Sequence, residues 1–151
     1  MIYGEKLKSI RTREGLTQEE LAKLIDVSKS LYSRYEKEIQ LIPAKHLITI
    51  CNHFDVSIDY IFNLNDKKQY PKVIPKTDKI KAGLKLKEFR KENNLTQEKL
   101  ANILNTTQSV IADYERGRYL IATPFLYQIC KTYRISADYL LGKIDNPKYL
   151  K

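Results

Sequence analysis

The sequence contains one pattern twice. Residues 4–60 align with residues 83–139 without a gap, at a spacing of 79 positions. Leu16-Thr17-Gln18-Glu19 matches Leu95-Thr96-Gln97-Glu98, and Ser57 matches Ser136. A repeat of this length is too long for a solenoid unit and fits two small domains, since a domain of about 60 residues can fold alone. Positions shared by both copies are expected to serve the fold, whereas positions that differ are free to carry a role specific to one copy.

Composition marks the boundaries of the two copies. Residues 65–79 are polar and contain Pro71, Pro75 and five lysines, the composition of a solvated, partly extended linker. The sequence therefore predicts a first domain over residues 1–64, a linker over 65–79, a second domain over 80–143 and a tail over 144–151. The tail carries Asn146-Pro147 and no second apolar stripe. The sequence leaves open whether this tail is frayed or docks on a partner subunit.

Apolar spacing and capping residues predict five short helices in each copy and little strand. Leu7 and Ile10 form the inner face of the first helix. The later helix starts are marked by Thr17 with its capping-box partner Glu20, Ser28, Pro43 and Ser57 in copy one, and by Thr96, Thr107, Thr123 and Ser136 in copy two. The predicted fold is all-α, with two tandem five-helix domains.

The charge balance indicates an acidic partner. The net charge is +9 and the pI is about 9.4, which suits a partner rich in phosphate or an acidic surface. Residues 1–78 carry 13 Lys and Arg against 11 Asp and Glu, while residues 79–151 carry 14 against 7, so the basic excess lies in the second half. No apolar run approaches the roughly 20 residues of a membrane helix. We expect a cytoplasmic protein without membrane association.

The sequence gives no sign of a metal, cofactor or catalytic site. His46 and His53 lie near Cys51, but the matching positions in copy two are Phe125 and Thr132, which argues against a metal site. Cys51 and Cys130 share one repeat position on an apolar face, so each is expected to be a small buried side chain rather than half of a disulfide. Motifs for phosphate loops, zinc proteases or activated nucleophiles are absent from the sequence. We expect no enzyme, no cofactor and no small-molecule ligand.

The segment between the second and third predicted helices has the compact spacing of a helix-turn-helix unit. A helical wheel separates the third helix into an apolar side and an outer side, the latter formed by Lys29, Ser30, Ser33, Arg34 and Lys37. Copy two divides in the same way, with an outer side of Gln108, Ser109, Ala112, Asp113 and Arg116. Small side chains allow close approach to the floor of the DNA major groove, and Lys, Arg and Gln reach base edges and phosphates.

Both copies resemble the lambda-repressor and Cro type of helix-turn-helix domain, the XRE-like family. The resemblance in copy one lies in Leu16-Thr17-Gln18-Glu19-x-Leu21-Ala22, Val27-Ser28-Lys29-Ser30, Ser33-Arg34-Tyr35-Glu36 and Val56-Ser57-Ile58-Asp59-Tyr60-Ile61. In copy two it lies in Leu95-Thr96-Gln97-Glu98-x-Leu100-Ala101, Thr107-Gln108-Ser109, Tyr114-Glu115-Arg116-Gly117-Arg118 and Ile135-Ser136-Ala137-Asp138-Tyr139-Leu140-Leu141. These blocks cover nearly all of the chain outside linker and tail.

The resemblance implies that the third helix of each copy is a recognition helix for double-stranded DNA. It implies that Gln18 and Gln97 bond a phosphate or support the first residue of that helix. Base readers would be Lys29, Ser30, Ser33 and Arg34 in copy one, and Gln108, Ser109 and Ala112 in copy two. Residues just after the helix, Lys37, Arg116 and Arg118, would grip the phosphate backbone, which supplies affinity rather than sequence choice.

Two acidic residues depart from the family pattern. Glu38 stands where the family usually has Gly, as Gly117 does in copy two, and it would put a carboxylate near the expected phosphate path. Asp113 lies on the outer side of its helix, where its charge is unfavourable near DNA unless it accepts from a cytosine amino group or pairs with an Arg. These residues favour an alternative, a protein-interaction module of the antitoxin or inhibitor kind.

The first hypothesis is a sequence-specific transcriptional regulator, a repressor of the kind found in prokaryotes and their mobile elements. Two recognition helices reading successive major grooves must lie about 34 Å apart. A 15-residue linker spans up to roughly 50 Å, so one chain could bind both half-sites.

Whether chains also form a homodimer stays open, since an apolar stripe on the fifth helices could pack between copies or between chains. This stripe comprises Ile58, Ile61, Phe62, Ala137, Leu140 and Leu141.

Overall fold

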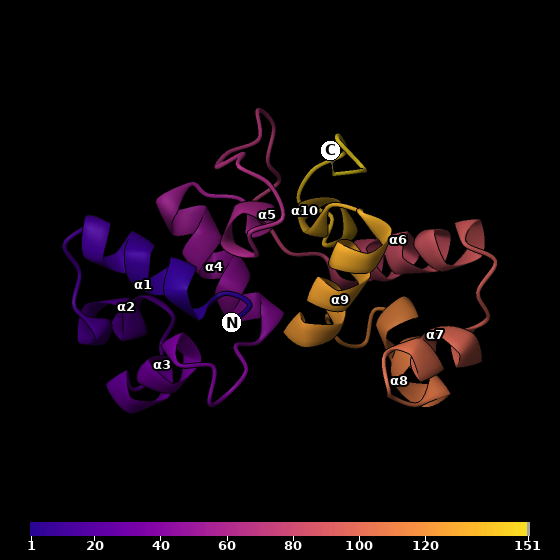
Figure 1. Ribbon diagram of the computed structural model, residues 1–151, viewed down its shortest axis with the longest axis horizontal. Helices are drawn as coiled ribbons and strands as arrows, with labels where there is room; N and C mark the ends of the chain where they lie inside the picture. The colour runs from indigo at the N-terminus through magenta and orange to yellow at the C-terminus, as the bar shows by residue number, and fades with distance from the viewer. Residues whose placement is uncertain (151) are drawn as a thin grey trace. The chain divides into compact units, whose positions relative to one another are not determined.

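The computed structural model describes residues 1–150, and the chain divides into two compact units, residues 1–69 and a second unit that starts at Tyr70. Each unit holds five helices (Figure 1). Within residues 1–150, an isolated bridge between Ile135 and Tyr149 is the only β-structure. The predicted all-α fold of two tandem five-helix domains is confirmed.

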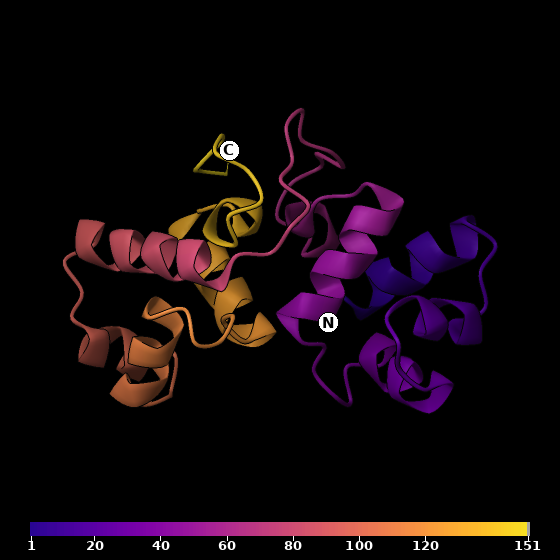
Figure 2. The ribbon, with the colours of Figure 1, turned by 180° about the vertical axis from the view of Figure 1, so that it is seen from behind.

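The helices of the two units correspond one to one. The first unit contains α1 (Gly4–Arg13), α2 (Gln18–Leu24), α3 (Lys29–Glu36), α4 (Ala44–Phe54) and α5 (Ile58–Ile61). The second contains α6 (Lys79–Glu92), α7 (Gln97–Ile103), α8 (Gln108–Glu115), α9 (Thr123–Tyr133) and α10 (Ala137–Leu140). In the second unit, α7 and α8 lie together below α6 when seen from either side (Figures 1 and 2).

Most helices begin where the capping residues predict. Thr17 and Glu20 form a complete capping box, in which Thr17 Oγ1 accepts from Glu20 N at 3.1 Å and Glu20 Oε1 accepts from Thr17 N at 3.0 Å. Ser28, Ser57, Thr96 and Ser136 also cap their helices through the side chain. Thr107 precedes α8 but makes no side-chain cap bond.

The predicted cap at Thr123 is wrong. The N-cap of α9 is Ala122, and Thr123 is the first helical residue, with a buried side chain. Pro124 occupies the first turn, where a missing N–H breaks no intrahelical bond. The helix therefore starts one residue earlier than a threonine cap would place it.

Glycine at one repeat position lets the first helix touch the end of the third. A Cβ atom on Gly4 would lie 2.0 Å from Glu36 O, and one on Gly83 would lie 2.4 Å from Tyr114 O and 2.6 Å from Glu115 O. These contacts are with backbone atoms, which cannot swing away as a side chain can. Only glycine permits such a close approach of α1 to α3 and of α6 to α8.

The amino end of the first helix is capped differently in the two units. In the first unit, Glu38 reaches back from the turn after α3 and accepts from Ile2 N at 2.9 Å, Tyr3 N at 3.1 Å and Gly4 N at 2.9 Å. In the second unit, Asp78 caps α6 locally and accepts from Ile80 N and Lys81 N. A carboxylate at this end also interacts favourably with the helix dipole.

The segments after the fifth helices fold back in both units. Ser57 N donates to Lys68 O, and Ser136 N donates to Lys148 O at 2.8 Å, so each segment is pinned to the cap of its own fifth helix. Lys148 Nζ also contacts the carboxylates of Glu88 and Glu92 on α6. The side chain of Leu150 is buried. The tail up to Leu150 therefore packs on its own unit, and the frayed alternative is not what the structure shows.

Predicted core positions are buried. Cys51 and Cys130 are both buried and unbridged, as expected from their shared repeat position. All six residues of the apolar stripe on α5 and α10 are also buried. The stripe is therefore not an exposed surface in this structure.

Replacing Glu38 should loosen the first helix. We expect Glu38→Ala to destabilise the start of α1 by about 1–2 kcal/mol, because three N–H groups lose their acceptor. Hydrogen exchange of the α1 amides in the full chain would measure this as roughly 5–30-fold lower protection. Glu14→Ala removes an exposed carboxylate at the opposite end of the same helix and should lower no protection. Equal protection in both variants would contradict the capping role.

Adding a methyl group at Gly83 should separate α6 from α8. We expect Gly83→Ala to destabilise the second unit by about 1–3 kcal/mol or more, as overpacking does elsewhere, because the new Cβ meets backbone carbonyls. Hydrogen exchange resolved over α6–α10 would show the loss, while protection in the first unit stays unchanged. Lys87→Ala, at an exposed position of the same helix, is the control. Unchanged protection in Gly83→Ala would refute the close-packing argument.

Candidate DNA-recognition surface

A tight turn joins the second and third helices in each unit. In the first unit Asp26 adopts a left-handed conformation with φ of 57°, and Val27 N donates to Ala22 O. In the second unit Asn105 has φ of 56°, and Thr106 N donates to Ala101 O. The same two features fix the start of α3 and of α8. This is the helix-turn-helix geometry that the spacing predicts.

The outer face of α3 is open to solvent. Tyr32 and Tyr35 are buried, whereas Lys29, Ser30, Arg34 and Lys37 are exposed and Ser33 is partly exposed. Arg34 donates from a terminal guanidinium nitrogen to Ser30 Oγ at 3.2 Å, one turn earlier. The structure therefore brings all five of these predicted contact residues onto one side of α3 or directly after it.

The corresponding face of α8 has a different chemistry. Ile111 and Tyr114 are buried, while Gln108, Ser109, Arg116 and Arg118 are exposed and Ala112 is partly exposed. Between the two units, Lys29 is replaced by Gln108 and Arg34 by Asp113. The buried sides thus keep their apolar character while the outer sides diverge.

An ion pair with a buried carboxylate ties the recognition helix to the first helix. In the first unit Arg11 Nε lies 2.6 Å from Glu36 Oε2, with 11% of the Arg side chain and 4% of the Glu side chain exposed. Arg11 also donates to Leu16 O at 2.9 Å, just before α2. The second unit repeats these contacts, with Arg90 Nε 2.7 Å from Glu115 Oε2 and Arg90 bonded to Leu95 O at 2.9 Å.

The two predicted glutamines join the same network. Gln18 Nε2 donates to Glu36 Oε1 at 3.2 Å, and Gln97 Nε2 donates to Glu115 Oε1 at 3.2 Å. In the second unit, Gln97 Oε1 also accepts from Gln108 Nε2 at 3.3 Å. Gln97 therefore contacts the first residue of α8 directly. Both glutamines remain partly exposed.

The ionisation of these groups follows from their contacts. Burial raises the pKa of Glu36, but hydrogen bonds from Arg11 and Gln18 lower it by more, so the net shift is downward. The hydrogen bond to Glu36 raises the pKa of Arg11, and the bond to Glu115 raises the pKa of Arg90. The Arg11–Glu36 pair is therefore ionised at neutral pH and provides a fixed, charged contact.

The two unexpected acidic residues have partners within their own units. Asp113 Oδ1 lies 2.6 Å from a guanidinium nitrogen of Arg116 and 3.8 Å from one of Arg118. Glu38 is engaged by three backbone N–H groups at the start of α1. Each carboxylate is thus offset by donors or cations of the same unit.

The residues that support the surface carry no local signal in the sequence. Arg11, Glu36, Arg90 and Glu115 were not singled out, because each pair is separated by 25 residues and no local pattern links its members. Their identity in both copies was the available signal: a charged residue kept at an inward helical position in a repeat needs a partner.

The part of the chain that the structure describes contains no cluster of metal-ligating side chains and no membrane-spanning helix. Within residues 1–150, no three His, Cys, Asp or Glu side chains group as metal ligands would. His53 packs edge-on against Phe54, with ring centroids 4.8 Å apart, and burial lowers the pKa of His46. None of the helices in this range has the length and apolar character needed to span a bilayer.

Comparison with known proteins gives the same picture of two copies. The family model described as Helix-turn-helix matches residues 7–61 and again residues 86–140. An uncharacterized HTH-type transcriptional regulator of Bacillus subtilis, YobD, is 39% identical over 72 residues, which are 48% of this chain and 63% of that protein. Another from Rickettsia conorii, RC0668, is 29% identical over 101 residues, 67% of this chain and 81% of that protein.

A more limited likeness concerns an antitoxin. PezA of Streptococcus pneumoniae, named an antitoxin, is 34% identical over 56 residues, 37% of this chain and 35% of that protein. The chain spans less than two thirds of the length of YobD and about a third of PezA.

The family match covers most of the chain, and both matched segments contain the buried network and the open outer face of the third helix. Regulators of this family bind double-stranded DNA in general. The chain belongs to the lambda-repressor-like (XRE-like) helix-turn-helix family of transcriptional regulators, with two tandem copies of the domain.

Proposed function

We propose that this chain is a sequence-specific, double-stranded DNA-binding transcriptional repressor with two non-identical recognition helices, α3 and α8. The observation that carries the proposal is the contrast within the repeat. A shared internal network holds each recognition helix, and the exposed side chains on that helix differ between the units. A scaffold kept constant beneath two different surfaces fits two different DNA half-sites.

Each exposed group has a defined task in this proposal. Lys29 and Gln108 read base edges from the start of their helices, with Ser30, Ser33, Arg34, Ser109 and Ala112 as further contacts. Gln18 and Gln97 bond phosphates or hold the first reading residue in place. Lys37, Arg116 and Arg118 contact phosphates, which adds affinity without sequence choice. The linker raises the local concentration of the second domain to around millimolar once the first has bound.

The proposal also includes a setting. The protein acts in the cytoplasm of a prokaryote and is encoded by its chromosome or by a mobile element. It has no enzymatic activity, cofactor or small-molecule ligand. A homodimer is compatible with it, although one chain already supplies two recognition helices. The bacterial sources of the relatives support the prokaryotic setting.

A protein-interaction role remains the second candidate because of the likeness to PezA, which is named an antitoxin. Its support from acidic residues is weaker than the sequence suggests, since Glu38 and Asp113 both have partners within their own units. A gel shift with genomic fragments over a salt series separates the two. Specific binding that weakens steeply with salt supports DNA recognition, whereas no shift at low salt supports protein binding.

The preferred operator should be asymmetric. Random-site selection with the full chain should yield two different half-sites about one helical turn apart. Lys29→Ala should relax base choice in one half-site, and Gln108→Ala in the other, each at a cost of about 1–3 kcal/mol. Lys8→Ala, at an exposed position of α1, should change neither. Equal affinity for a perfect palindrome of either half-site would rule out two distinct reading helices.

Removing the charge of Asp113 should strengthen binding to unrelated DNA. Asp113→Asn frees Arg116 and Arg118 and removes a repulsive charge, so we expect non-specific affinity to rise about two- to fivefold, in line with the roughly 1 kcal/mol of an exposed ion pair. Fluorescence anisotropy with a random duplex would measure this. Asp113→Glu keeps the charge and should bind as the unmodified protein does. Unchanged affinity in Asp113→Asn would place α8 away from the phosphate backbone.

A further inference from the structure

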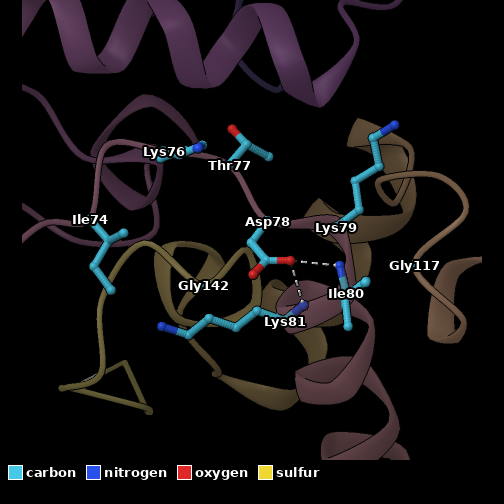
Figure 3. A pocket seen from close by; sticks show the side chains of 9 residues that line it. All are labelled: Ile74, Lys76, Thr77, Asp78, Lys79, Ile80, Lys81, Gly117 and Gly142. Carbon is cyan, nitrogen blue, oxygen red and sulfur yellow. Dashed lines mark hydrogen bonds between the residues drawn. The ribbon is translucent and has the colours of Figure 1, made fainter.

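A basic hollow lies at the amino end of α6. It encloses about 600 Å³ and is lined by linker residues, the first turn of α6 and Gly117. Figure 3 shows the lysines of this hollow, Lys76, Lys79 and Lys81, around the capping residue Asp78. All of these residues belong to the second unit. The hollow is therefore a feature of one domain and its attached linker.

Two of the three lysines are uncommitted. Lys81 Nζ lies 3.6 Å from Asp145 Oδ1. The Asp78 carboxylate accepts from Ile80 N at 3.0 Å and Lys81 N at 3.1 Å, so these two N–H groups are not available for another anion. Lys76 and Lys79 are exposed and form no ion pair within residues 1–150. The uncommitted positive charge at the hollow is therefore that of Lys76 and Lys79.

The hollow adjoins the turn that follows the recognition helix. A Cβ atom on Gly117 would come within 2.8 Å of Ile80 Cα, so this turn and the start of α6 touch backbone to backbone. Gly117 stands between Arg116 and Arg118, which are both exposed. We define Lys76, Lys79, Arg116 and Arg118 as the α6 basic strip. Its two halves are held together by a contact that leaves no room for a side chain.

We propose that the α6 basic strip is a phosphate-backbone contact surface, on which Lys76 and Lys79 extend the grip of Arg116 and Arg118 along one DNA strand. This inference rests on the proposed DNA-binding function and adds the linker to the interface. Duplex DNA is the partner that fits, because it presents phosphates in a continuous row that lysines and arginines can follow. The first unit has Glu38 in place of Gly117, with its carboxylate bound to α1, and so lacks the strip.

The salt dependence of binding tests this surface. Each phosphate contact contributes about 0.9 to the slope of log K against log salt concentration. We expect Lys76→Ala and Lys79→Ala in the full chain each to reduce the slope by about 0.9, and the double variant by about 1.8, with the ratio of specific to non-specific affinity unchanged. Lys131→Ala removes an exposed charge on the last turn of α9 and should leave the slope as it is. Circular dichroism checks that each variant is folded.

The outcomes separate this inference from the proposed function. If the full chain binds DNA but Lys76→Ala and Lys79→Ala match Lys131→Ala, the strip is not a phosphate surface, although the chain still binds DNA. If neither the unmodified protein nor any variant binds DNA at low salt, the proposed function fails and this inference fails with it. Calorimetric titration with inorganic phosphate alone should show no saturable binding. Saturable binding lost in the double variant would assign the hollow to a free anion and overturn the proposal.

Discussion

A buried guanidinium–carboxylate pair fixes the position of the recognition helix in each unit. Arg11 with Glu36, and Arg90 with Glu115, connect the first helix to the end of the third and to the leucine that precedes the N-cap of the second. Breaking such a pair by removing one partner typically costs 3–5 kcal/mol, because the other charge stays buried. The glutamine at the start of the second helix bonds the same carboxylate, so the packing of three helices converges on one group.

This arrangement separates what holds the domain from what it presents. The carboxylate at the end of the third helix is buried, whereas the residues proposed to read bases lie on the exposed face of the same helix. Substitutions on the outer face therefore leave the ion pair intact, which explains how Lys29 and Gln108, or Arg34 and Asp113, occupy equivalent sites on one scaffold. The two acidic residues also leave the ion pair intact, because each has its own partners. Asp113 pairs with Arg116, and Glu38 accepts hydrogen bonds from backbone N–H groups.

Local signals in the sequence predicted much of the fold. The capping box at Thr17, the caps at Ser28 and Ser57 and the division of α3 into two faces follow from patterns within a few residues, and the structure confirms them. The roles of the outer residues on DNA stay predictions. Thr123 was misplaced because Ala122, which has no capping side chain, can still begin a helix that has proline in its first turn.

Contacts between distant residues could not be predicted in this way. The Arg–Glu pairs join residues 25 positions apart, and Glu38 caps a helix whose first residue precedes it by 34 positions. Glu38 was expected to face phosphates because its neighbour Lys37 is predicted to contact them. Its left-handed conformation, with φ of 55°, accompanies a side chain that reaches the start of α1 instead. Such a placement depends on how the helices pack, which one sequence does not display.

The two ways of capping the first helix differ in how far along the chain the capping carboxylate lies. Asp78 is adjacent to the amide groups that it caps, so the start of α6 can form before any other helix of its unit is in place. Glu38 reaches α1 only after the chain has closed a loop through α2 and α3. The entropy cost of closing this loop comes before the gain from the capping hydrogen bonds of Glu38. Contacts between residues far apart in sequence in general slow folding. The cap of α1 therefore depends on the tertiary fold of the first unit, whereas the cap of α6 is local to its own first turn.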